Sequence, residues 1–153
     1  MARFWLCLLT TVGIGLAISY CSGIFGNVSA YASRLPFRIP KGWVIAAPPV
    51  LFAHMGIALY LVLDNSVSSY TERMVRGWTW AFWISLFIAT SITPYFIFHG
   101  MPIAAYVMST ITTALAIGTT LLCYRSSISA GFVMTIFLIV VTLIMVYLAY
   151  WAF

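Results

Sequence analysis

The chain has 153 residues, of which 64% are hydrophobic and only 6% are charged. A soluble domain carries about 25% charged residues, so this composition excludes a water-soluble globular protein, a disordered chain and a nucleic-acid-binding domain. What remains is an all-α integral membrane protein. Seven Lys/Arg residues against two acids give a net charge of +5. Membrane topology and contacts with the lipid bilayer explain this positive charge better than binding to nucleic acid does.

Five apolar segments follow one another along the chain, and each has roughly 20 or more residues, enough to cross a hydrocarbon core about 30 Å thick. Lipid offers no partners to unpaired backbone groups, so each segment is expected to be a helix. We predict one transmembrane domain over residues 1–153, a five-helix bundle in a bacterial inner membrane or an organelle membrane such as the mitochondrial one. The expected helices are 4–25, 43–63, 78–98, 102–124 and 128–152.

The connections between these segments differ in length. Residues 99–101 and 125–127 are short turns, which make the segments on either side antiparallel neighbours. The connection 64–77 is polar, and we expect it to lie outside the hydrocarbon. The longest connection, 27–42, contains aromatic residues, prolines and cations, and is expected to pack over one end of the bundle.

Small residues recur at a spacing of four in the first segment and at similar spacing in the fourth. In lipid, helices associate through close packing of small side chains. We expect these stripes to be helix–helix contacts, either inside one bundle or between chains. They consist of Gly15, Ser19 and Gly23 in the first segment, and of Ala105, Ser109 and Thr113 in the fourth.

Titratable groups are scarce at membrane depth. The two acids, Asp64 and Glu72, both fall in the polar connection, whereas proton-driven transport uses an ionisable group inside the membrane. Hydrolytic chemistry uses paired acids or a supported nucleophile. The three cysteines form no CxxC pair, which argues against a metal site and against a disulfide framework. The sequence therefore favours a protein that is not an enzyme.

The second segment contains His54, about one turn after Pro48 and Pro49. Proline lacks the N–H group that a helix carbonyl needs as its partner, so a polar-walled pocket is expected here. A neutral imidazole at this depth must face the bundle interior, a ligand or another subunit. It would either bond a neighbouring hydroxyl or act as the axial group of a haem or pigment.

The third segment is rich in aromatic residues at both ends. Trp78, Trp80 and Trp83 near its start are typical of the membrane interface, where an indole is half wet. Tyr95 and Phe98 near its other end are candidates to line a pocket for a flat apolar ligand.

Three stretches carry a family resemblance. Residues 35–44 read LPFRIPKGWV, a proline-rich end of the long first loop followed by a tryptophan, and residues 55–62 read MGIALYLV. Residues 93–98 read TPYFIF, which is similar to a tryptophan-(Ser/Thr)-Pro-x-Phe-Phe motif with Ile92 in place of the tryptophan. Over nearly its whole length the chain resembles the TspO/MBR family, the tryptophan-rich sensory proteins and the mitochondrial translocator protein, or peripheral benzodiazepine receptor.

The resemblance implies a TspO-like five-helix bundle and non-catalytic binding of a flat apolar ligand for sensing or transfer. A tetrapyrrole, a carotenoid, a sterol or a lipid would fit that role. We expect Trp43, His54, Tyr95 and Phe98 to line a pocket between the first three helices.

The fifth helix of the family carries Pro-Tyr-Leu-x-Trp, whereas residues 136–140 of this chain read IFLIV. The alternative function is therefore that of an accessory structural subunit of a larger membrane complex, respiratory or photosynthetic. Such a subunit would keep the TspO fold but would have lost the ligand site. The partners expected under these two functions are a second copy of the chain or a larger membrane protein complex.

Overall fold

The computed structural model describes residues 1–21 and 41–153, apart from the side chains of residues 41, 43 and 44. The described chain is helical, and five of its helices are long and apolar enough to cross a membrane. This confirms the prediction of an all-helical, multi-pass membrane protein. The helices are α1 (Ala2–Cys21), α3 (Lys41–Asp64), α4 (Tyr70–Phe98), α5 (Pro102–Ser126) and α6 (Ile128–Ala152).

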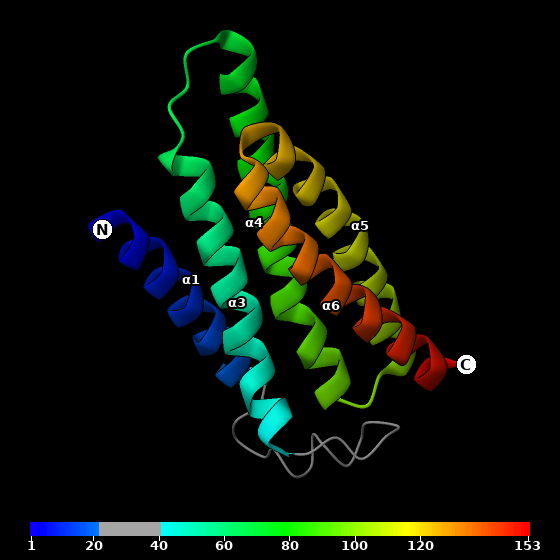
Figure 1. Cartoon of the computed structure of the whole chain (residues 1–153). Helices are drawn as coiled ribbons and strands as arrows, with labels where there is room; N and C mark the ends of the chain where they lie inside the picture. The colour runs from blue at the N-terminus through cyan, green and yellow to red at the C-terminus, as the bar shows by residue number, and fades with distance from the viewer. Residues whose placement is uncertain (22–40) are drawn as a thin grey trace.

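The five helices form a ring whose order differs from their order in the chain. Helix α1 packs against α3, α3 against α6, α6 against α5, and α5 against α4, while α4 also contacts α1. The last helix therefore lies between α3 and α5 (Figure 1). Helices α3 and α4 are joined in sequence, yet their backbones do not approach closely, and side chains fill the space between them.

Helix α4 begins about two turns earlier than the sequence predicted. The backbone N–H of Glu72 donates to the Ser69 hydroxyl over 3.2 Å, and the Glu72 carboxylate accepts from the N–H of Ser69 over 3.1 Å. This reciprocal pair is a capping box, which starts a helix even in a polar stretch. With 29 residues, α4 is about 44 Å long, and its first turns project beyond the other helices (Figure 1).

The connection between α3 and α4 is therefore only residues 65–69, and it is tied to the bundle. The Arg76 guanidinium donates to the carbonyls of Val62, over 3.0 Å, and of Asn65. The Asn65 amide donates to the Ser126 carbonyl over 2.6 Å. These bonds hold the ends of α3, α4 and α5 together at one end of the ring.

Small residues allow α1 and α3 to pack closely. A methyl group on Gly15 would overlap the Phe52 ring, and a methyl group on Gly56 would lie 3.1 Å from the Cys7 carbonyl oxygen of α1. Ser19 is buried one turn beyond Gly15. Gly23, the third residue predicted for this stripe, lies outside the described residues.

The stripe predicted in α5 is also buried inside the bundle. Ala105, Ser109 and Thr113 are all buried, and Ala105 packs with Ile97 of α4 and Leu148 of α6. Both stripes, as far as the structure describes them, therefore face other helices of the same chain.

Candidate functional site

Aromatic rings fill the space between α3 and α4. The Phe52 ring of α3 lies 5.2 Å, centroid to centroid, from the Phe87 ring of α4. Phe87 stacks on Trp83 at 5.5 Å with an interplanar angle of 18°, and Trp80 meets Trp83 edge-on at 6.1 Å. We call Phe52, Trp80, Trp83 and Phe87 the aromatic cluster.

Two local features fix the position of this cluster. The Trp83 indole N–H donates to the Met55 carbonyl of α3 over 3.2 Å, and this bond joins the two helices across the space. The Phe52 ring occupies the space that the missing side chain of Gly15 leaves on α1. Trp83 and Phe87 are four residues apart and therefore share a face of α4. Three helices thus contribute to the cluster.

The polar groups buried in the described part of the bundle are all neutral hydroxyls, supplied by Ser and Thr side chains. Most of them donate to a carbonyl of their own helix three or four residues earlier, as Thr79, Thr93 and Thr112 do. A charged ligand group in this part of the interior would find no counter-ion and would lose its hydration. The interior described here is therefore suited to neutral, largely apolar molecules.

His54 lies away from the aromatic cluster. It is two residues beyond Phe52, hence about 200° around the helix, and it is half-buried beside the exposed Val50. Its ring Nδ1 is 2.8 Å from the Val50 carbonyl oxygen, so the imidazole bonds its own helix. Its predicted contact with a ligand or another subunit stays a prediction.

The other residues predicted to line the pocket are not brought together with His54. Tyr95 is on an exposed face of α4, where its ring lies 4.0 Å from the His99 ring. Phe98 is half-buried and packs beside Ile97, near α5 and α6. The Trp43 side chain lies outside the described residues.

A second apolar feature lies on the outer surface where α4 turns into α5. It is a wide, shallow depression of about 560 Å³ lined by Phe96, Pro102, Val107 and Met108 among others. It opens outward and does not reach the aromatic cluster. In the described parts of the chain, no three His, Cys, Asp or Glu side chains gather as a metal site would require.

Sequence reasoning missed the aromatic cluster because it assigned the tryptophans to the membrane interface. Trp78 is 58% exposed, in keeping with that assignment, whereas Trp83 is only 9% exposed and belongs to the core. The spacing of Trp83, Phe87 and Thr90, at four and three residues, is the signal that places them on one helix face.

Comparison with known proteins identified no relatives: no protein-family model, no curated protein and no solved structure matches the chain.

Proposed function

We propose that the chain is a divergent TspO/MBR-like membrane protein that binds a flat apolar ligand, without catalysis, for sensing or transfer. The proposed site lies between α1, α3 and α4 at the aromatic cluster, whose rings fill the space in the ligand-free protein and would part to admit a ligand. A neutral tetrapyrrole ester, a carotenoid, a sterol or a lipid would suit such a site.

The observation that carries this proposal is how α3 and α4 meet. Helices α1 and α3 pack backbone against backbone at Gly56. Between α3 and α4 the contact consists of aromatic rings, chiefly Phe52, Trp83 and Phe87. Such rings stack favourably on another flat ring. Little backbone packing holds α3 and α4 together, so a ligand that enters between them would have to part the rings of the cluster and break the bond from the Trp83 indole to the Met55 carbonyl, while the backbones could stay in place.

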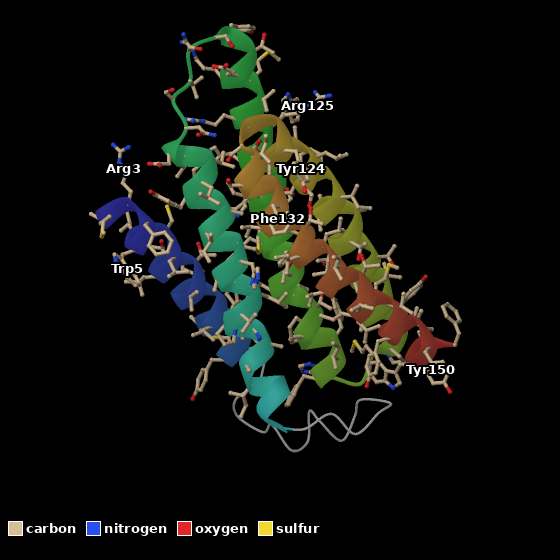
Figure 2. The ribbon with its side chains drawn as sticks, in the orientation of Figure 1. Arg3, Trp5, Tyr124, Arg125, Phe132 and Tyr150 are labelled. Atoms are coloured by element: carbon tan, nitrogen blue, oxygen red, sulfur yellow. The ribbon has the colours of Figure 1, made fainter. Side chains whose placement is uncertain are left out.

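The test is a titration of the purified protein with pyrene, a flat apolar fluorophore that accepts energy from tryptophan. We expect saturable energy transfer. Phe87→Leu removes a stacking ring and should raise the Kd by about 2–10-fold. Its matched control is Phe132→Leu, since Phe132 is 63% exposed on the outer face of α6 (Figure 2). Non-saturable transfer, or equal effects of the two substitutions, would count against the proposal.

A second function, as a structural subunit of a larger membrane complex, is favoured by the outer face of α6. Ile128, Phe132, Ile136, Leu143 and Val146 form part of an exposed apolar stripe along that helix. Native electrophoresis after mild detergent extraction separates the two proposals. Migration as a monomer or small homo-oligomer favours the ligand binder, and migration with a large complex favours the subunit.

A further inference from the structure

One residue beside the aromatic cluster is buried without satisfying its hydrogen-bonding groups. Thr90 of α4 is 8% exposed, and its Oγ1 has no hydrogen-bond partner. Thr93 is equally buried, yet its hydroxyl donates to the Ala89 carbonyl over 3.0 Å. Buried hydroxyls are almost always bonded, so an unbonded one calls for an explanation.

The main chain at the same residue also lacks its usual partner. A helix carbonyl accepts from the N–H four residues later, and the residue four after Thr90 is Pro94, which has no N–H. No side chain in the described residues donates to this carbonyl. Thr90 therefore offers one hydroxyl donor and one carbonyl acceptor, both without the partners that a helix normally supplies.

Thr90 is placed where a ligand in the proposed site would end. It lies seven residues, or two helical turns, beyond Trp83, and so on the same face of α4. It is three residues beyond Phe87, which places it nearly one turn past the last ring of the cluster in α4. A ligand lying along these rings would bring one end to Thr90.

We infer that Thr90 determines the specificity of this site by binding the hydroxyl of a neutral, flat apolar alcohol. A ligand hydroxyl is at once a donor and an acceptor, so it pairs with the Thr90 carbonyl and with the Thr90 hydroxyl. A carboxylate has no proton for the carbonyl and finds no cation in the described interior. This inference rests on the proposed function and adds the chemical class of the ligand.

The test compares three pyrene probes that differ in one group: 1-pyrenebutanol, its methyl ether and 1-pyrenebutyrate. Binding is read as saturable energy transfer from tryptophan. We expect the alcohol to bind about 5–10-fold more tightly than the ether, the gain of a hydrogen bond, and the carboxylate to bind most weakly. Thr90→Val removes the hydroxyl from which both the alcohol oxygen and the ether oxygen accept, so it should weaken the binding of both probes by about 5-fold, whereas Thr93→Val, its matched control, should weaken neither. Pro94→Ala restores an N–H and should reduce the preference to about threefold.

Thermal stability of the ligand-free protein gives a second reading. Thr90→Val replaces an unbonded buried hydroxyl with a methyl group and should raise the Tm, whereas Thr93→Val breaks a bond and should not. If the alcohol and the ether bind equally and Thr90→Val changes nothing, the inference is overturned while the proposed function stands. Tightest binding of the carboxylate would also overturn it. If none of the three probes saturates, both fail.

Discussion

Replacing Gly15 with alanine tests the packing on which the aromatic cluster depends. The new methyl group would overlap the inner atoms of the Phe52 ring. That ring is 2% exposed and lies against Phe87, so it has little room to move. Overpacking a well-filled core costs about 1–3 kcal/mol, and alanine regains about 0.5–1 kcal/mol over glycine in a helix interior. We therefore expect Gly15→Ala to lower the free energy of unfolding by about 1 kcal/mol.

Gly13 supplies the matched control, because a methyl group there would meet no atom within 4 Å. Gly13→Ala gains the same helix propensity without the overlap, so the two variants should differ by about 1–3 kcal/mol. Unfolding in mixed micelles with increasing SDS, followed by tryptophan fluorescence, measures both. Adding Phe52→Leu to Gly15→Ala should recover part of the loss. If Gly15→Ala is as stable as Gly13→Ala, the proposed contact between α1 and α3 is wrong.

Three further predictions concern the hydrogen bonds that hold α4. Trp83→Phe removes the indole donor to α3 and also shrinks a side chain that is only 9% exposed. It should lower the free energy of unfolding by more than about 0.6 kcal/mol, the average for interhelical bonds in membranes, because packing is lost as well. Trp78→Phe, on an exposed face, should cost less in the same SDS titration. Ser69→Ala removes the cap of α4 and should destabilise the start of this helix by about 1 kcal/mol, which hydrogen exchange would show as faster amide exchange in its first turns. The control is Ser66→Ala, outside the helix; if it speeds the exchange as much as Ser69→Ala does, the role of the cap is contradicted. Arg76→Gln removes the guanidinium that donates to the carbonyls of Val62 and Asn65. The connection 65–69 should then be less firmly held, and proteases should cleave it faster. An unchanged cleavage rate would contradict the role of these bonds.

The sequence was sufficient to predict the five membrane helices, because long apolar runs leave a helix as the only backbone arrangement that lipid permits. It was less informative about where α4 begins. Ser69 and Glu72 have the spacing of a capping box, but the prediction gave more weight to the polarity of that stretch and began the helix at Trp78. Outside the hydrocarbon a cap can begin a helix in a polar stretch, as Ser69 and Glu72 do here, which explains the difference.

The candidate site was harder to predict, because lipid and bundle interior are equally apolar. In a soluble protein, hydrophobic periodicity shows which helix face is buried. In a membrane both faces are apolar, so the sequence does not show that Trp83 faces inward and Tyr95 outward. The same limit applies to His54: its place in the chain fixes its depth, whereas its direction depends on how α3 is rotated against α1 and α6.

Photo-crosslinking tests the central claim most directly, because it locates a bound molecule. A diazirine derivative of 1-pyrenebutanol would be photolysed with the protein in lipid bilayers, with and without an excess of 1-pyrenebutanol, and the labelled residues mapped by mass spectrometry. We predict that the adducts removed by competition lie on α3 and α4, around Phe52, Trp83 and Phe87. Competed adducts confined to the outer face of α6, around Phe132, or the absence of any competed adduct, would contradict the account.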